Sequence, residues 1–382
     1  MKRVAFYYPW IHLRSGVEHM ILELLKRTRH RVTVFTSHLD YEHTFPEFRD
    51  VRDIVELRRV SVRRSVTTVL GAALTIARQQ LPLRNFDALL VSSEGLGDFI
   101  TFRNRTVPTL CYCHSLVRPV YDPVYRASLI ERRPHLRWSL PPFLPAYRTL
   151  TRRAWRHYRH VFANSRVTRE QILANQLCAP AVVEVLHPGA DPPRAKAGEY
   201  EMFFLYAGRI KWTKNVELAI RAFREFRARV ADARPWSLVV AGEVDPTSSE
   251  YLNELQQLGG AGEGVVYRPN PSRPELETLY ARCYALVYPS LNEPWGIVPV
   301  EAMAYGRPVL AVNRGGPTES ILDGETGFLL DPTPAAFAAR MVWLADNPEA
   351  LRRMGVAAAR RAGEFSWDTF VRRMDDCIES LG

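Results

Sequence analysis

The sequence of 382 residues contains no run of about 18 or more apolar residues, so no segment is expected to span a membrane. Its cysteines, at positions 111, 113, 178, 283 and 377, are odd in number and scattered. Cys111 and Cys113 lack a second Cys or His pair at zinc-binding spacing. The first apolar run is too short for a signal peptide and is typical of a strand. We therefore expect a cytoplasmic protein with reduced cysteines.

Several nucleotide- and metal-binding signatures are also missing. No G-x-G-x-x-G turn separates the first strand from the first helix, which argues against a dinucleotide-dependent oxidoreductase. No Asp-x-Asp segment is present to bridge a metal ion to a diphosphate. No zinc-finger, helix-turn-helix or RNA-binding motif is present either, so a nucleic-acid-binding protein is suggested by charge alone. We expect no metal, no other cofactor and no nucleic-acid partner.

The charge is unevenly distributed along the chain. Residues 1–195 contain 30 Lys and Arg against 16 Asp and Glu, whereas residues 196–382 contain 21 against 25. The basic first half could bind an acidic substrate or the anionic inner face of a membrane. The simpler interpretation is an arginine-rich surface that is only solvated. Arg148, Arg152 and Arg156 share one helix face, for which solvation is the simpler interpretation and membrane or acceptor binding the alternative.

Short apolar runs alternate with helical stretches throughout the chain, a pattern that predicts parallel sheets with helices on both faces. A segment rich in Pro and Gly, residues 187–201, interrupts the alternation. We expect two Rossmann-like, doubly wound α/β domains, residues 1–190 and 200–366, facing each other across a cleft, with a last helix of about residues 367–382 that packs back on the first domain. The strands are expected at residues 4–8, 32–37, 54–60, 88–93, 109–114, 161–165 and 182–186, and then at 203–208, 237–241, 265–267, 285–289, 308–312 and 327–330.

The segment of residues 291–331 contains two carboxylates eight positions apart, Glu293 and Glu301. Between them, Pro299 suits the first turn of a helix over residues 300–305 that ends at Gly306. The free amides of residues 296–298 would then face an anion, and the two acids would bind neutral hydroxyls. A sugar joined to a nucleotide through a diphosphate has these parts in this order.

Three further segments support this interpretation. In YAGRIKWTKN, residues 206–215, a strand delivers Arg209 and then Lys214, two cations that can bind a diphosphate and stabilise it as it departs. In CYCHSLVRPVYD, residues 111–122, His114 closes an apolar strand. In HLRSGVEHM, residues 12–20, Gly16 precedes a helix and is a weaker candidate for a phosphate-binding loop.

With these segments in view, the chain resembles the retaining glycosyltransferases of family 4, also called glycosyl transferases group 1, which have the GT-B fold. The resemblance extends over nearly the whole chain and is strongest in GRIKWTKNVELAIRAF, YPSLNEPWGIVPVEAMAYGRPVLA and GGPTESILDGETGFLL. It implies a hexosyltransferase that uses a nucleotide-sugar donor and a glycan or lipid-linked acceptor. Retention of configuration at the anomeric carbon follows from the same resemblance.

The resemblance also implies a role for each matched residue. Catalytic roles fall to Glu293, His114, Arg209 and Lys214. Donor binding falls to Gly16, Arg209, Lys214, Glu243, Arg268, Glu293, Trp295, Gly296, Ile297, Val298 and Glu301. Of these, Glu301 is expected to bind the ribose, and Glu243 and Arg268 to lie near the nucleobase.

The sequence departs from the family pattern at two places and leaves the donor open. Ser15 stands where the family usually has the first of two glycines, and Leu116 stands where proline commonly follows the His-Ser pair. The segments YCHS and GIVPVEAMAYGRPV resemble those of a subgroup that often uses GDP-mannose. GDP-mannose is therefore the leading candidate for the donor. UDP-glucose and UDP-N-acetylglucosamine remain alternatives, as does a non-catalytic sugar-nucleotide-binding subunit.

Overall fold

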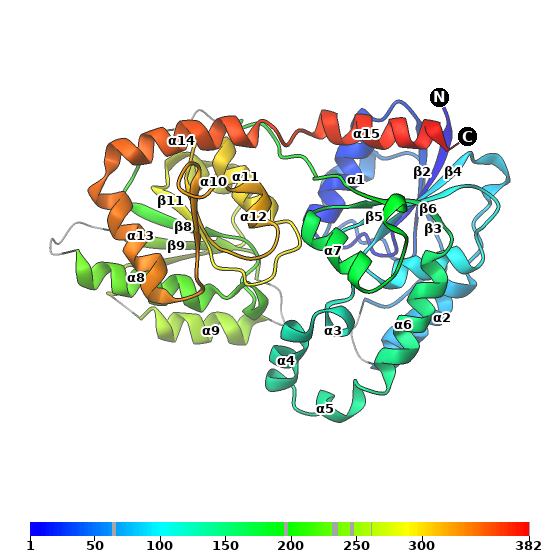
Figure 1. Cartoon of the computed structure of the whole chain (residues 1–382), viewed down its shortest axis with the longest axis horizontal. Helices are drawn as coiled ribbons and strands as arrows, with labels where there is room; N and C mark the ends of the chain where they lie inside the picture. The colour runs from blue at the N-terminus through cyan, green and yellow to red at the C-terminus, as the bar shows by residue number, and fades with distance from the viewer. Residues whose placement is uncertain (63–65, 195–197, 231–235, 245–247, 261, 382) are drawn as a thin grey trace. The chain divides into compact units, whose positions relative to one another are not determined.

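The computed structural model describes residues 1–62, 66–194, 198–230, 236–244, 248–260 and 262–381. They form two compact units, Met1–Gly189 together with the chain from Trp367 onward, and Ala190–Ser366 (Figure 1). Each unit contains one parallel sheet, so the predicted pair of parallel-sheet α/β domains is confirmed. Within the part of the chain that is described, no helix is both long and apolar enough to cross a bilayer.

The first unit contains a seven-stranded parallel sheet in the order β3-β2-β1-β4-β5-β6-β7. Its central strands are almost fully buried, which explains why they appear in the sequence as continuous apolar runs, whereas the strands at the two edges are partly exposed. The strands are β1 (Arg3–Tyr7), β2 (Arg31–Thr36), β3 (Ile54–Glu56), β4 (Ala88–Ser93), β5 (Thr109–Cys113), β6 (Tyr158–Ala163) and β7 (Val183–Val185).

Helices cover both faces of this sheet and build two apolar clusters. The α-helices are α1 (Gly16–Arg27), α2 (Val66–Arg78), α3 (Arg118–Tyr121), α4 (Pro123–Arg132), α5 (Leu136–Ser139), α6 (Phe143–Trp155), α7 (Arg166–Ala174) and α15 (Trp367–Ser380). Four short 3₁₀ helices are η1 (Pro46–Asp50), η2 (Leu83–Asn85), η3 (Leu96–Phe102) and η4 (Pro180–Val182).

The C-terminal helix α15 belongs to the first unit, where it packs beside α1. The ring of Phe370, on α15, is fully buried and lies 5.1 Å from the ring of Tyr112 on β5. Polar contacts reinforce the packing, because Thr28 donates to the buried carboxylate of Asp375 at 2.6 Å. The last helix therefore completes one face of a sheet whose strands lie more than 180 residues earlier in the chain.

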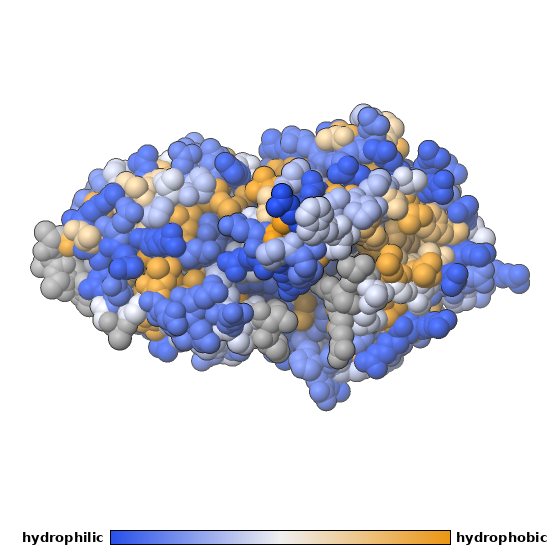
Figure 2. Space-filling model, turned by 90° about the horizontal axis from the view of Figure 1, so that it is seen from below, coloured by the Kyte–Doolittle hydropathy of each residue, from blue (hydrophilic) through white to orange (hydrophobic). Residues whose placement is uncertain are grey.

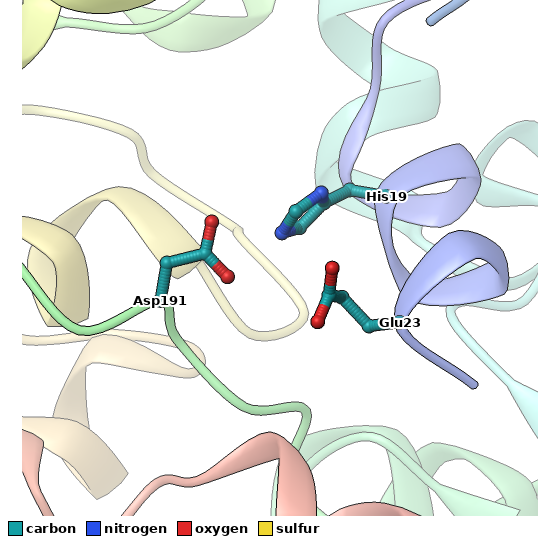
Figure 3. Close-up of side chains that lie close together, drawn as sticks. All are labelled: His19, Glu23 and Asp191. Carbon is teal, nitrogen blue, oxygen red and sulfur yellow. The ribbon is translucent and has the colours of Figure 1, made fainter. Parts of the chain in front are cut away.

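Figure 3 shows His19 and Glu23 one turn apart on α1. The His19 ring lies 5.5 Å from the ring of Trp367 at the start of α15, while the Glu23 carboxylate accepts from Lys26 at 2.9 Å. Asp191, also labelled in Figure 3, belongs to the second unit, in which its carboxylate lies 3.6 Å from the guanidinium of Arg273.

The second unit contains a six-stranded parallel sheet in the order β10-β9-β8-β11-β12-β13. The strands are β8 (Phe203–Ala207), β9 (Ser237–Gly242), β10 (Val265–Pro269), β11 (Ala285–Tyr288), β12 (Val309–Val312) and β13 (Gly327–Leu330). Helices again lie on both faces (Figure 1). They are η5 (Trp212–Lys214), α8 (Val216–Arg229), α9 (Ser249–Leu258), α10 (Arg273–Arg282), α11 (Ile297–Ala304), α12 (Pro317–Ser320), α13 (Pro334–Asp346) and α14 (Pro348–Ala362).

The predicted strands are all present, and the differences are in their ends. The strand expected over residues 54–60 ends at Glu56, because only Ile54–Glu56 pair with β2. The helix expected over residues 300–305 begins three residues earlier, at Ile297, so that prediction was wrong about its start. Pro299 is therefore the third helical residue, a position at which its missing N–H still costs no hydrogen bond.

We predict that Phe370→Ala destabilises the first unit by about 3–5 kcal/mol, because it removes a fully buried ring and leaves a cavity between α15 and the sheet. Amide hydrogen exchange of β1, β4 and β5 would measure the change for this unit alone. Val356→Ala, at a position 75% exposed on α14, is the control and should leave exchange in β1, β4 and β5 unchanged. Equal protection in the Phe370 variant and wild type would contradict the packing role of α15.

Candidate functional site

The carboxyl ends of β8 and β11 define the centre of the second sheet. β8 is the first strand of this unit, and the chain continues through β9 and β10 on one side of it and through β11, β12 and β13 on the other. In open parallel sheets, ligands bind outside the carboxyl ends of the strands at such a reversal of strand order. The loops of residues 208–215 and 289–296 follow these two strands and meet at this point.

An ion pair connects the two loops. Lys214, in η5 after β8, donates from Nζ to the Oε2 carboxylate oxygen of Glu293, in the loop after β11. Both side chains are largely but not fully buried, with 15% of Lys214 and 20% of Glu293 exposed. Asn215 joins the same loops from the backbone side, because its side-chain amide donates to the carbonyl of Pro289 at 3.3 Å. The predicted cation and the predicted acid are therefore in direct contact.

Two buried phenols lie beside this pair. Tyr206, next to last in β8, donates its hydroxyl to the carbonyl of Arg209 at 2.8 Å, which fixes the turn that carries the exposed Arg209 side chain. Burial raises the pKa of Tyr206 and of Tyr288, and the carboxylate of Glu293 raises both pKa values further. Both hydroxyls therefore remain protonated donors at neutral pH. The sequence prediction missed them because each one resembles an ordinary core residue within an apolar strand.

The start of α11 lies next to Glu293. Gly296 is the N-cap residue with φ of +85°, and a side chain there would lie 3.0 Å from the Tyr288 hydroxyl and 3.4 Å from Glu293 Cγ. The amides of Gly296, Ile297 and Val298 belong to the first turn, where backbone N–H groups have no intrahelical acceptor. A helix start with its partial positive charge thus adjoins a carboxylate paired with a lysine.

Two consecutive glycines fix the loop that carries Glu293. A Cβ atom on Gly315, whose φ is +73°, would lie 2.4 Å from the Glu293 carbonyl oxygen. A Cβ atom on Gly316 would lie 2.1 Å from the Trp295 carbonyl oxygen, and the Gly316 amide donates to the Glu293 carbonyl at 2.8 Å. The backbone between β12 and α12 therefore packs directly on residues 293–295. The paired glycines in NRGGP were the available sequence signal for this contact.

The second predicted acid, Glu301, has partners of its own. It accepts from the Arg273 guanidinium at 2.9 Å and from the Tyr280 hydroxyl at 3.0 Å, and 14% of its side chain is exposed. Arg273 also donates to Glu277 at 2.8 Å. Glu301 is thus an oriented carboxylate one helical turn after the amides of the α11 start. Neither Arg273 nor Tyr280 was anticipated, because both lie on α10, far from Glu301 in the sequence.

The remaining predicted residues of this unit lie along the same edge of the sheet. Glu243 follows β9 and its carbonyl accepts from the Ile210 amide at 2.8 Å, which links it to the β8 loop. Arg268 lies in β10, exposed, near the carboxyl end of the outermost strand. Trp295 is 4% exposed and its ring packs against that of Phe365 at a distance of 5.1 Å, so the indole belongs to the core.

His114 belongs to the first unit and follows β5. Its Nε2 lies 2.8 Å from the Ser92 hydroxyl, and its carbonyl accepts from the Asn164 side chain at 2.7 Å. Burial lowers the pKa of His114 to about 4, although the nearby charge of Glu94 acts in the opposite direction. The imidazole is therefore neutral at physiological pH. It can donate one hydrogen bond and accept another without adding a charge.

Gly16, the weakest sequence candidate, begins α1 behind the N-cap residue Ser15. Open space surrounds the position of its missing side chain, so a group could approach the backbone closely. The helix start already contains an internal carboxylate, because Glu18 accepts from Ser15 and, at 3.3 Å, from the Leu13 amide. Burial raises the pKa of Glu18 to about 7, while the Ser15 hydroxyl lowers it.

Comparison with protein families assigns both halves of the chain. Residues 14–194 match the family described as Glycosyltransferase Family 4, and residues 191–361 match Glycosyl transferases group 1. The chain belongs to the GT-B glycosyltransferases of family 4 and is a glycosyltransferase.

The relatives are named as mannosyltransferases and other glycosyltransferases. Alpha-1,3/1,6-mannosyltransferase alg-2 of Neurospora crassa is 25% identical over 100% of this chain and 91% of its own length. D-inositol 3-phosphate glycosyltransferase of Streptomyces avermitilis is 34% identical over 55% of this chain, and ALG2 of Mus musculus is 34% identical over 47%. The chain spans about half the length of the latter two relatives, 49% and 46%.

Solved structures share the fold over the whole chain. Sucrose-phosphate synthase from Thermosynechococcus elongatus has a TM-score of 0.75 at 19% identity, covering 100% of this chain and 99% of that one. HepE from Anabaena, solved with UDP and glucose, has a TM-score of 0.72 at 16% identity, with both chains covered in full. These likenesses confirm the GT-B fold predicted from the sequence.

The close packing of Gly315 predicts that its substitution lowers activity, whereas substitution of Gly324, which has a similar φ, should not. Gly315→Ala combines an unfavourable positive φ with a collision at the Glu293 carbonyl, and we expect at least a tenfold lower kcat/KM, about 1.4 kcal/mol of lost transition-state stabilisation. Gly324 has a φ of +76° and open space around it, so Gly324→Ala has the backbone strain without the collision. Steady-state kinetics that show equal losses would exclude a positioning role for Gly315.

The pKa of His114 predicts how pH changes the stability of the first unit. The folded pKa of about 4 lies below the unfolded value of about 6.5, so the unfolded chain binds more protons between these pH values. The free energy of unfolding should therefore fall as pH drops from about 6.5 to 4, by at most about 3 kcal/mol from this group. His114→Gln should reduce that slope in denaturation experiments, whereas His43→Gln, with 70% of the side chain exposed, is the solvent-accessible control. An unchanged slope in His114→Gln would contradict the lowered pKa of His114 in the folded protein.

Proposed function

We propose that this glycosyltransferase transfers mannose from GDP-mannose, with retention of anomeric configuration and without a metal ion, to a glycan or lipid-linked acceptor. The observation that carries the proposal is the contact between Lys214 and Glu293 beside the first turn of α11. A cation, an oriented carboxylate and a helix start lie together at the reversal of strand order, where a nucleotide diphosphate joined to a sugar finds a partner for each of its parts.

The donor diphosphate would bind Arg209, Lys214 and the amides of residues 296–298. Lys214, which contacts Glu293, and the amides of the helix start are held in place before the reaction, and all of these groups would stabilise the negative charge that develops as the nucleoside diphosphate departs. They would supply the stabilisation that a metal ion provides elsewhere, and no Asp-x-Asp segment is present in the sequence to bind one. Arg209 is exposed at the tip of its turn, so its side chain is free of the core and can reach a bound phosphate.

Glu293 would orient the sugar and support positive charge on its ring. In the transfer, the bond between the anomeric carbon and the phosphate oxygen breaks while a bond to the acceptor oxygen forms on the same face. The acceptor proton passes to the departing phosphate oxygen, so that no separate protein base is required. When the diphosphate binds Lys214, the carboxylate of Glu293 would be released from part of its ion pair and become available to sugar hydroxyls.

Glu301 would bind the ribose hydroxyls, with Arg273 and Tyr280 fixing its orientation. Glu243 and Arg268 lie at neighbouring strand ends and would border the nucleobase. His114 and Gly16 belong to the first unit, and their predicted contacts with the transferred sugar and the phosphates stay predictions.

Mannose is favoured because three relatives are named as alpha-1,3/1,6-mannosyltransferases, and the Neurospora crassa protein aligns with the whole chain. The alternative donor is UDP-glucose or UDP-N-acetylglucosamine, since HepE, which shares the fold, is solved with UDP-glucose. A non-catalytic donor-binding subunit is less well supported, because Arg209, Lys214, Glu293 and Glu301 are all present and Lys214 contacts Glu293.

The donor assignment predicts that GDP-mannose raises the melting temperature more than UDP-glucose or UDP-N-acetylglucosamine, since a ligand that binds only the folded state stabilises it.

Lys214→Ala and Glu293→Ala should each lower kcat/KM by about 100-fold or more, whereas Arg221→Ala, which removes an exposed charge from α8, should not. Activity should persist in a metal chelator, and the product should have the anomeric configuration of the donor.

Each part of the proposal has its own contrary result. Stabilisation by UDP-glucose alone would transfer the assignment to the alternative donor. An inverted product would exclude the retaining mechanism, and loss of activity in the chelator would exclude metal independence. Wild-type rates in both site variants would remove the site assignment altogether.

A further inference from the structure

The first unit contains a helical excursion between β5 and β6 that is poorly buried. Helices α4 and α5 contain no buried side chain, whereas α1 of the same unit contains seven. In Figure 1, α4 and α5 lie at the far end of this excursion, away from the sheet of their own unit. The two helices are therefore not held by core packing, and their sequence needs another explanation.

Their exposed side chains are unusually apolar. Trp138 on α5 is 81% exposed, Val124 on α4 is 53% exposed and Leu150 on the adjoining helix α6 is 40% exposed. Further large apolar residues of the segment are only partly buried, namely Tyr125, Leu129, Ile130, Leu136 and Leu140. Single exposed apolar residues are common, but a run of this density on adjoining helices is typical of an interaction surface. Figure 2 views the molecule from this side, where hydrophobic and hydrophilic residues are intermixed.

The same segment is strongly basic. Residues 123–156 contain eight arginines and one acidic residue, Glu131. Three of the arginines donate to backbone carbonyls: Arg126 to that of Pro119 and Arg148 to that of Val120, each at 3.0 Å, and Arg152 to that of Asn175 at 3.4 Å. Six of the arginines are exposed, namely Arg132, Arg133, Arg137, Arg152, Arg153 and Arg156. The helix face expected to contain Arg148, Arg152 and Arg156 together is thus divided, with Arg148 directed inward.

We propose that α4, α5 and the exposed side of α6 form a docking surface for an anionic lipid bilayer. Aliphatic side chains and Trp138 would enter the boundary between headgroups and acyl chains, and the exposed arginines would bind lipid phosphates. Tryptophan prefers this boundary because its ring is apolar while its N–H is polar. Arginines and an aromatic ring would also suit RNA, but RNA would leave Val124, Leu129 and Ile130 without an apolar partner. This surface lies within one unit and goes beyond the proposed transfer reaction.

Vesicle sedimentation of the full-length protein tests the proposal. We expect binding to phosphatidylcholine vesicles with about 30% phosphatidylglycerol, little binding to phosphatidylcholine alone, and weakening as salt rises to about 0.5 M. The triple variant Arg132→Gln, Arg133→Gln, Arg137→Gln should lower the partition coefficient at least about tenfold, and Trp138→Ala about fivefold. None of these four side chains is buried, so the variants should retain the melting temperature and the binding of the nucleotide-sugar donor.

The matched control removes the same charge from another place. Arg352→Gln, Arg353→Gln, Arg360→Gln on α14 changes three exposed arginines in the second unit and should leave the partition coefficient within about twofold of wild type. Equal losses in the two triple variants would show that net charge alone attracts the protein and would overturn the proposal. So would an unaffected Trp138→Ala variant, a wild-type protein that ignores anionic vesicles, or binding to RNA without binding to vesicles. Donor binding is measured separately, so its failure would count against the transfer reaction alone.

Discussion

The second unit depends on one constraint, that β8 and β11 are neighbours although about 80 residues separate them in the chain. Because the two strands are parallel, the loops that follow them leave the sheet at the same edge. This geometry allows Lys214 to contact Glu293 and Asn215 to donate to the carbonyl of Pro289. A cation and a carboxylate, each unremarkable in its own loop, thereby become one electrostatic unit beside the positive end of α11.

Preorganisation at this edge comes largely from the backbone. Gly315 and Gly316 approach residues 293–295 so closely that no side chain fits between them, and a Cβ atom on Gly296 would lie 3.0 Å from the Tyr288 hydroxyl. Such contacts fix the carbonyls and amides of the loop without adding a charged group. The charged side chains are then positioned by hydrogen bonds from uncharged neighbours, as Tyr280 does for Glu301. Electrostatic stabilisation of a departing diphosphate requires this kind of rigidity. Dipoles that had to reorient during the reaction would add a free-energy cost to the transition state.

The charged groups of the first unit are distributed differently. His114 is neutral, and the start of α1 contains its own carboxylate, Glu18. Positive charge is instead displayed on the exposed helices between β5 and β6. The excess of basic residues in the first half is therefore not evenly spread, since residues 123–156 alone contain eight arginines. In the second unit, by contrast, Lys214 and Glu293 place opposite charges in contact at the edge of the sheet.

The amino-acid sequence by itself determined the presence of the strands, the two α/β domains and the family, and it predicted a site built from Arg209, Lys214, Glu293 and Glu301. Buried parallel strands and helix termini leave local patterns of apolar runs, glycines and prolines, and these can be recognised without long-range information. Only the tertiary structure decided the order of the strands, the pairing of Glu301 with Arg273, the burial of the Trp295 ring and the inward direction of Arg148. These features depend on contacts between residues far apart in the chain. The sequence around a residue does not specify which distant residues it will contact.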